Sequence, residues 1–165
     1  MSRLLHLATV YILFHSATAF AQGRVPKSTD YPARVTHTAR AVKIQLHSTP
    51  DTICFRTMLR KTAHDGQLFA GHYALWYWGC GTCARVGIVD LLTGRAYVTP
   101  FMVSTAQGVY KVTPNSRLLI VHDPEIDTTS YFLWTGRHLL PITNGRIERW
   151  EPEREFQTCT GMSRL

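Results

Sequence analysis

The chain has 165 residues, 45% of them hydrophobic, and 18 Lys and Arg stand against 11 Asp and Glu, a formal net charge of +7. This length suits one globular domain with a proper core, and the positive balance favours acidic partners such as anionic glycans or acidic proteins. The sequence has no run of Lys or Arg and no RNA-binding signature, which argues against a nucleic-acid partner.

The first residues have the three parts of a secretory signal peptide. Arg3 gives a positive start, residues 7–14 (LATVYILF) are continuously apolar, and residues 19–21 (AFA) have the small-x-small pattern of a cleavage site. The apolar run is too short to cross a membrane as a helix. Since residue 22 is Gln rather than Cys, the new N-terminus offers no site for a lipid. We therefore expect residues 1–21 to be removed and a water-soluble protein, not embedded in a membrane, to reach the periplasm or the extracellular space.

Four cysteines follow this segment: Cys54, Cys80, Cys83 and Cys159. An even number of cysteines in an exported chain predicts two disulfides, for which three pairings are possible. We favour Cys80 with Cys83, which the sequence holds close together, and Cys54 with Cys159, which would tie a helix to the C-terminal tail. Closing so long a loop would contribute on the order of 4 kcal/mol in the chain-entropy model.

The chain before residue 67 contains the one segment that predicts a helix. Residues 22–38 are polar and without periodicity, which predicts a flexible lead-in to a single domain at 39–165. Residues 41–47 (AVKIQLH) alternate apolar and polar side chains and predict a half-buried strand. The Thr-Pro-Asp sequence at 49–51 is typical of a helix start, and Asp65-Gly66 ends that helix. One stripe of this helix holds Cys54, Phe55, Met58, Leu59 and Thr62.

Everything after Gly66 predicts antiparallel strands joined by turns. Strands are expected at 69–78, 86–91, 96–103, 109–112, 118–122, 131–134 and 138–142. The pattern strand–Thr-Gly-Arg–strand occurs twice, but the chain is too short for the blades of a propeller. The predicted fold class is therefore α+β: a curled antiparallel β-meander with one N-terminal helix packed on it, stapled by disulfides. The tail from Asn144 is predicted to be a loop.

The densest segment is residues 69–90, FAGHYALWYWGCGTCARVGIVD. It contains an F-A-G-H-Y strand, a W-G-C-G-T turn with a cysteine, and the start of an I-x-D-x-x-T-G hairpin. With these motifs the chain resembles a group of uncharacterised exported bacterial proteins, over roughly Phe55 to Ile142. The resemblance implies an exported protein, and it brings no activity that can be transferred to this chain.

Alternation along the expected strand at 69–78 places His72, Trp76 and Trp78 on one face, with Ala74 between them. One face of this strand should meet the helix. The face with the two Trp residues either belongs to the core or forms an aromatic platform for sugars or peptide segments. His72, Trp76 and Trp78 are therefore the candidate binding residues, and we expect Trp76 to be buried and Trp78 to be partly exposed.

The spacing Cys80-x-x-Cys83 beside Trp78 is also typical of thiol–disulfide oxidoreductases. That chemistry needs the first cysteine at a helix N-terminus, where the dipole stabilises a thiolate, whereas the flanking residues here predict strands. A zinc site would need two further ligands at suitable spacing, and the acidic loop Asp123–Asp127 lacks the later Gly and Glu of an EF-hand. The sequence contains no common hydrolase, phosphate-loop or dinucleotide motif.

From these observations we predict no catalytic residue, no cofactor and no metal. The favoured function is a non-catalytic binding module, such as an inhibitor, an immunity-type protein or an adaptor, with a protein or glycan partner of acidic character. The alternative is an enzyme: either a thiol–disulfide oxidoreductase using Cys80 and Cys83, or a hydrolase without a recognisable motif.

Overall fold

The structure is a computed structural model that describes residues 24–36, 43–46, 50–80, 83–99, 103–104, 109–124 and 126–149. The expected signal peptide and the tail with Cys159 lie outside these residues. The side chains of Cys80 and Cys83 are also outside the description, although the backbone at both positions is part of it.

The described chain is mostly β. Its strands are β1 (Gln67–Phe69), β2 (Tyr73–Cys80), β3 (Cys83–Asp90), β4 (Ala96–Val98), β5 (Val103–Ser104), β6 (Val109–Lys111), β7 (Leu118–Asp123), β8 (Thr128–Trp134), β9 (Leu139–Thr143) and β10 (Arg146–Ile147). Its helices are the 3-10 helix η1 (Ser28–Asp30) and the α-helices α1 (Pro50–Cys54) and α2 (Arg56–Asp65).

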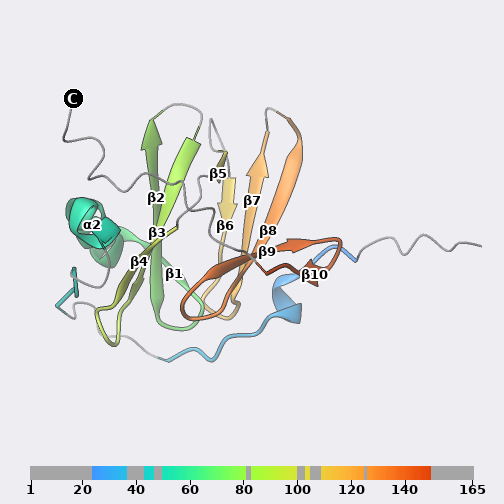
Figure 1. Cartoon of the computed structure of the whole chain (residues 1–165). Coiled ribbons are helices and arrows are strands. Elements are labelled where there is room, and N and C mark those ends of the chain that lie inside the picture. The colour runs from blue at the N-terminus through green and yellow to red at the C-terminus, as the bar shows by residue number, and fades with distance from the viewer. Residues whose placement is uncertain are drawn as a thin grey trace, which may run out of the picture.

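The strands form two antiparallel sheets, in which consecutive strands pair with each other except β4 and β5, both of which pair with β3. The first sheet has the order β1-β2-β3-β4, with β5 also paired to β3, and the second has the order β10-β9-β8-β7-β6. The sheets lie face to face, with α2 on the far side of the first sheet (Figure 1). The expected antiparallel strands and packed helix are thus confirmed. The arrangement is two facing meanders and mostly β, however, rather than one curled α+β meander.

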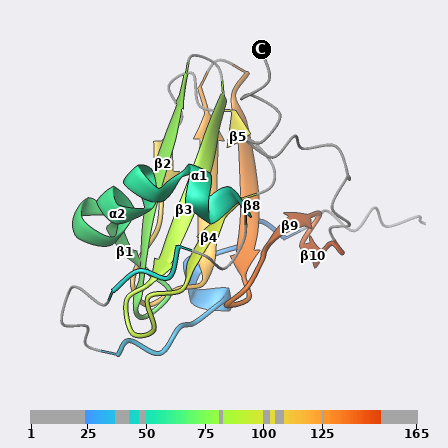
Figure 2. The same cartoon turned by 60° about the vertical axis from the view of Figure 1, so that its left-hand side comes forward.

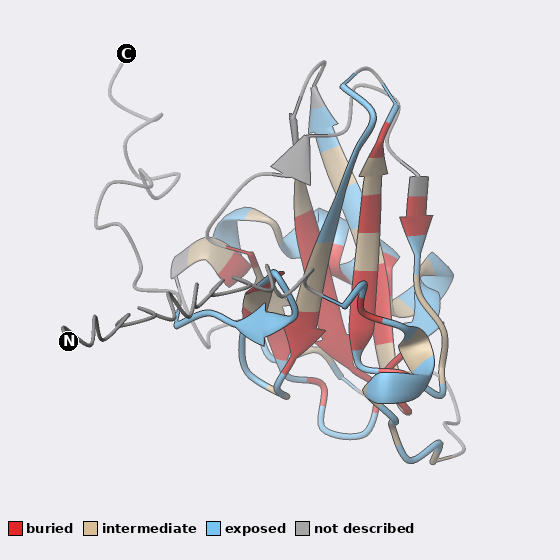
Figure 3. Ribbon diagram, turned by 90° about the vertical axis from the view of Figure 1, so that its right-hand side faces the viewer, coloured by how far each residue is buried: buried red, intermediate tan, exposed pale blue. Residues whose placement is uncertain are grey.

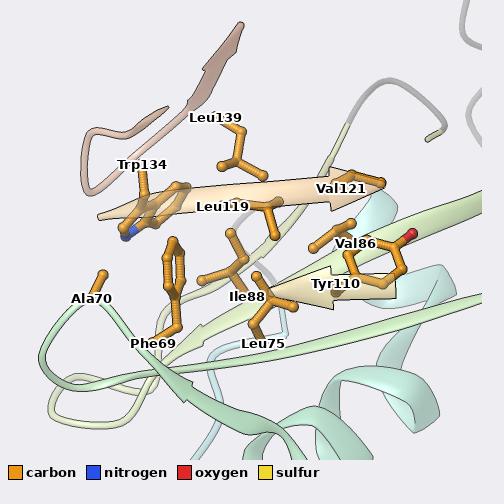
Figure 4. Close-up of a cluster of buried hydrophobic side chains, with 10 residues drawn as sticks. All are labelled: Phe69, Ala70, Leu75, Val86, Ile88, Tyr110, Leu119, Val121, Trp134 and Leu139. Carbon is orange, nitrogen blue, oxygen red and sulfur yellow. The ribbon is translucent and has the colours of Figure 1, made fainter. Parts of the chain in front are cut away.

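The main core fills the space between the two sheets. Phe69, Leu75 and Ile88 of the first sheet meet Leu119 and Trp134 of the second, and all five are almost fully buried (Figure 4). Large apolar side chains suit this position, because two facing sheets stand about 10 Å apart. Buried residues accordingly run along the middle of the strands (Figure 3). In β3 the inward side chains of Val86 and Ile88 are both apolar and almost fully buried.

A second cluster lies between the helices and the outer face of the first sheet (Figure 2). Leu59 of α2 is fully buried there, and Ala74 and Val89 of the sheet are almost fully buried. The face of β2 that meets the helix is therefore the one with Ala74, Trp76 and Trp78, and the Leu75 face meets the second sheet. Small side chains explain the choice, because Ala74 and Gly87 let the helix approach the sheet closely.

The helix prediction for residues 50–65 is confirmed, with one interruption. Phe55 separates α1 from α2 with backbone angles φ −96° and ψ 21°, and Gly66 follows the last turn. The predicted stripe is only half correct, because Leu59 and Thr62 are fully buried whereas Met58 is 38% exposed. Over the described residues 43–46 the expected strand is reduced to an isolated bridge from Gln45 to Arg95, although Ile44 and Leu46 pack inward as the alternation predicted.

Residues 24–36, expected to be a flexible lead-in, run along the second sheet and are hydrogen-bonded to it. The Ala33 N–H donates to the Asn115 carbonyl at 2.8 Å, and the Arg117 N–H donates to the Tyr31 carbonyl at 2.8 Å. Tyr31 also packs against the small apolar cluster of Leu118, Leu133 and Ile142. The described part of this segment is therefore anchored to the domain.

The F-A-G-H-Y motif is a turn between two strands, and the single strand expected at 69–78 is wrong. β1 ends at Phe69 and β2 begins at Tyr73, and these two residues face each other across the hairpin. Ala70 has φ +47° and Gly71 has φ +95°, both in the left-handed region. A Cβ on Gly71 would collide with the backbone oxygen of Arg34, so glycine is needed here both for the angle and for the close approach.

Candidate functional site

The second half of β2 has one side on which the structure describes no neighbouring strand. β1 pairs with β2 only as far as Leu75, so that residues 76–79 have β3 on one side and no described strand on the other. We call residues 76–79 (WYWG) the aromatic edge. None of them is charged and none is proline, the residues with which proteins usually protect an exposed edge from pairing.

The hydrogen-bond alternation shows which backbone groups of the aromatic edge point away from β3. The Leu91 N–H donates to the His72 carbonyl at 3.0 Å, so this pair is a bonded one. Bonded pairs recur at every second residue of an antiparallel ladder, and they are therefore Trp76 with Gly87 and Trp78 with Arg85. Tyr77 and Gly79 consequently direct their N–H and C=O groups away from β3, toward the open side.

The two Trp side chains of the aromatic edge are both partly buried, but their surroundings differ. Trp78 lies over Gly87, where a Cβ would collide with the indole, and its ring is 5.5 Å from that of Phe55. Its Nε1 is buried without a hydrogen-bond partner among the described residues. Trp76 instead has the Lys61 ammonium 5.0 Å from its ring centroid. Trp78 thus belongs mainly to the packing under the helix, whereas Trp76 lies at the border of that packing.

Tyr77 points to the opposite side of β2 and is 42% exposed. Its ring stacks on that of Tyr110 of β6, with 4.2 Å between the centroids. Tyr110 is 9% exposed, and its hydroxyl is buried without a hydrogen-bond partner among the described residues. Burial raises the pKa of Tyr110 well above its usual range, and the neighbouring Tyr77 adds to the increase. This pair of rings joins β2 of the first sheet to β6 of the second.

Four cations belong to the two elements beside the outer side of the aromatic edge: Arg56, Arg60 and Lys61 of α2 and Arg85 of β3. Among the described residues none of the four forms an ion pair. Two of them lie over aromatic rings, Lys61 over Trp76 and Arg85 over Phe55 at 5.3 Å. A cation over a ring face is attracted by the ring, and it keeps donors available for an anion.

His72 lies at the other end of β2, in the turn that precedes the strand. Trp76 follows it by four positions along the chain, on the order of 13 Å at 3.3 Å per residue. Its ring stacks on Tyr73 at 4.4 Å and its Nδ1 is 3.1 Å from the Thr36 hydroxyl. The structure therefore brings Trp76 and Trp78 together but leaves His72 apart, and no platform contains all three residues.

Thr36, His72 and Asp90 have the order of a hydroxyl–imidazole–carboxylate relay, but the geometry favours a structural role. The Asp90 Oδ1 is 3.6 Å from the His72 Nε2, too far for a good hydrogen bond. The same oxygen accepts the N–H groups of Leu92 and Thr93 at 2.9 and 3.1 Å. Asp90 thus holds the turn between β3 and β4, and the cluster fixes the end of β2 where His72 lies.

Cys80 and Cys83 face each other where the β2–β3 hairpin closes. Opposite residues in an antiparallel pair have Cα atoms about 4.5–5.5 Å apart, within the range that a disulfide spans. Both residues belong to strands, so the helix N-terminus on which oxidoreductase chemistry depends does not occur here. Cys54 is disulfide-bonded.

One cavity of about 370 Å³ lies at the outer side of β8 and β9, against residues 24–26 of the lead-in. Its only cation, Arg24, already pairs with Asp30 at 2.9 Å. Within the described ranges no cluster of His, Cys, Asp or Glu is suited to a metal ion. The helices of the described part are all too short or too polar to span a membrane.

No family model, no curated protein and no solved structure matches this chain. Function therefore has to be inferred from the geometry of the residues themselves. The sequence identified Trp76 and Trp78, but it missed Tyr77, Tyr110 and Lys61, which contribute to the same end of the molecule. The alternation of β2 alone could have marked Tyr77, whereas the contacts of Tyr110 and Lys61 join distant parts of the chain and leave no local signal.

Proposed function

We propose that this chain is an exported, non-catalytic binding module, such as an inhibitor, an immunity-type protein or an adaptor, and that it holds an acidic protein at the aromatic edge. The observation that carries this proposal is the combination of an open strand edge, partly exposed aromatic rings and cations without ion pairs in one place. Aromatic rings offer large contact areas at low entropic cost, and cations favour partners of opposite charge.

The proposal places the mature protein, from Gln22 onward, in the periplasm or outside the cell. Disulfides between Cys80 and Cys83 and between Cys54 and Cys159 belong to it. The facing positions of Cys80 and Cys83 in the hairpin support the first pairing, and the disulfide-bonded state of Cys54 is compatible with the second.

Intact mass and non-reducing peptide mapping of exported protein test this part. We expect a mass that lacks residues 1–21, carries no lipid and contains no free thiol, with Cys54 linked to Cys159. A free thiol at neutral pH, together with insulin reduction that disappears in Cys80→Ser, would instead support the oxidoreductase.

Binding is tested by capture from an envelope extract with wild-type protein, Trp76→Ala and His72→Ala. We expect Trp76→Ala to lose the captured protein and His72→Ala to keep it, because only Trp76 lies at the aromatic edge. Thermal melting of each variant shows whether the fold is retained. Equal capture by all three proteins would contradict the proposed site, and capture that glycosidase treatment of the extract abolishes would identify a glycan as the partner.

A further inference from the structure

We infer that the partner binds by strand addition: an extended, acidic polypeptide segment pairs with the aromatic edge and becomes a further strand of the first sheet. This inference rests on the proposed function and specifies how that function is carried out. It makes the backbone of β2, rather than a pocket, the main source of hydrogen bonds.

The first argument is the set of free backbone groups. Tyr77 and Gly79 direct two N–H and two C=O groups to the open side, at the spacing of a regular antiparallel ladder. A strand edge without a neighbouring strand is a template for another strand. Since β1 pairs with the same edge up to Leu75, an added segment would continue the line of β1.

The second argument is what the side chains of an added strand would meet. Those on the outer side would lie beside Trp76 and the Lys61 ammonium above it. Those on the inner side would lie beside Tyr77, which is 42% exposed and stacked on Tyr110. Alternation of acidic and apolar side chains in the segment would therefore match a cation on one side and aromatic rings on the other.

The charge of α2 favours an acidic segment, rather than a second copy of the chain, as the partner at the aromatic edge. Pairing β2 with β2 of another copy around a two-fold axis would continue the sheet and place both α2 helices on the same face. Each α2 has Arg56, Arg60 and Lys61 against the single carboxylate of Asp65. Like charges brought together at an interface oppose association, whereas an acidic segment would be attracted.

The test uses the full exported chain and two synthetic probes, acetyl-Glu-Val-Glu-Val-Glu-amide and its lysine counterpart. We expect the acidic probe to bind saturably and to slow hydrogen exchange at the Tyr77 and Gly79 amides, with little change at Trp76 and Trp78, which are already bonded to β3. The lysine probe should leave all four amides unchanged.

Two pairs of variants separate the backbone from the side chains. Tyr77→Pro removes an outward N–H, which an edge strand tolerates, whereas Tyr77→Val keeps it and removes only the ring. We expect Tyr77→Pro to weaken binding of the acidic probe about tenfold more than Tyr77→Val does. Lys61→Glu should weaken binding further than Arg137→Glu, which makes the same change in charge in the exposed turn between β8 and β9.

The inference is overturned if Tyr77→Pro binds as well as Tyr77→Val, if both probes bind equally, or if exchange at Tyr77 and Gly79 does not respond to the acidic probe. It is also overturned if the chain dimerises through β2, or if the Tyr77 and Gly79 amides are protected until residues 150–165 are deleted. A Tyr77→Pro protein that fails to fold leaves the exchange measurement on wild type to decide. Capture of a partner by Tyr77→Pro but not by Trp76→Ala would keep the proposed function and reject strand addition alone.

Discussion

At its Tyr73 end β2 is held from several sides, whereas at its Gly79 end one side of the strand is open. The Tyr73 end pairs with β1 and β3, and His72 beside it contacts Thr36 and Tyr73. The Gly79 end pairs only with β3 among the described residues and presents Trp76 and Tyr77. One strand can thus serve the fold at one end and leave backbone groups for a partner at the other.

The largest expected difference concerns the two Trp residues at the open end. Trp78→Ala should lower the free energy of unfolding by about 3 kcal/mol, because its indole packs on Phe55 and Gly87. Trp76→Ala should cost only about 1 kcal/mol, since its ring lies at the border of the packing. Urea titrations of both variants beside wild type measure the difference. Equal costs would show that the aromatic edge is ordinary core.

The next comparison concerns the Tyr73 end of β2, where Gly71 lies in the preceding turn. Gly71→Ala should cost about 2–3 kcal/mol, because the residue has φ +95° and its new methyl group would collide with the Arg34 backbone. Gly136 also has a positive φ, +92°, but a Cβ there would be at an ordinary 3.6 Å from the Tyr73 hydroxyl. Gly136→Ala should therefore cost only about 1 kcal/mol. The same denaturation assay tests this pair, and equal costs would show that residues 24–36 do not press on the turn.

The smallest effect is expected for Tyr110→Phe, which removes a buried hydroxyl without a described partner. At neutral pH the free energy of unfolding should change by less than about 1 kcal/mol. Because burial raises the pKa of Tyr110, the folded state binds the phenolic proton more tightly than the unfolded state does. Its contribution to stability is complete below the ordinary tyrosine pKa of 10.0 and is lost as the pH rises above it.

Thermal melting at a series of alkaline pH values checks this sign. Wild type should lose stability above pH 10 more steeply than Tyr110→Phe does. Tyr73→Phe is a second test at the Tyr73 end of β2, since burial raises the pKa of Tyr73 as well and Asp90 adds to the increase. An alkaline loss that is unchanged in both variants would contradict the role of burial at these two hydroxyls.

Local patterns predicted most of the hairpins and the helix, because each depends on residues that are close together in the sequence. Turn residues determine the hairpins, and the apolar stripe with Leu59 and Thr62 determines the helix. The turn at Ala70–His72 was missed, since Ala70 is not a residue that usually adopts φ +47°. The single curled sheet was wrong because which meander faces which is decided by contacts far apart in the sequence. The aromatic edge has a different cause: β1 ends its pairing at Leu75, which depends on the register of a hairpin whose turn was not predicted from the sequence.

The lead-in has a consequence for the order in which the protein can fold during synthesis. The Ser116 hydroxyl donates to the Tyr31 carbonyl across 85 positions of sequence. At 5–20 residues per second, the ribosome makes Tyr31 roughly 4–17 s before it makes Ser116. Each meander can form from neighbouring strands as soon as it is made, but residues 24–36 are made first and can dock only after most of the second sheet's sequence has followed them.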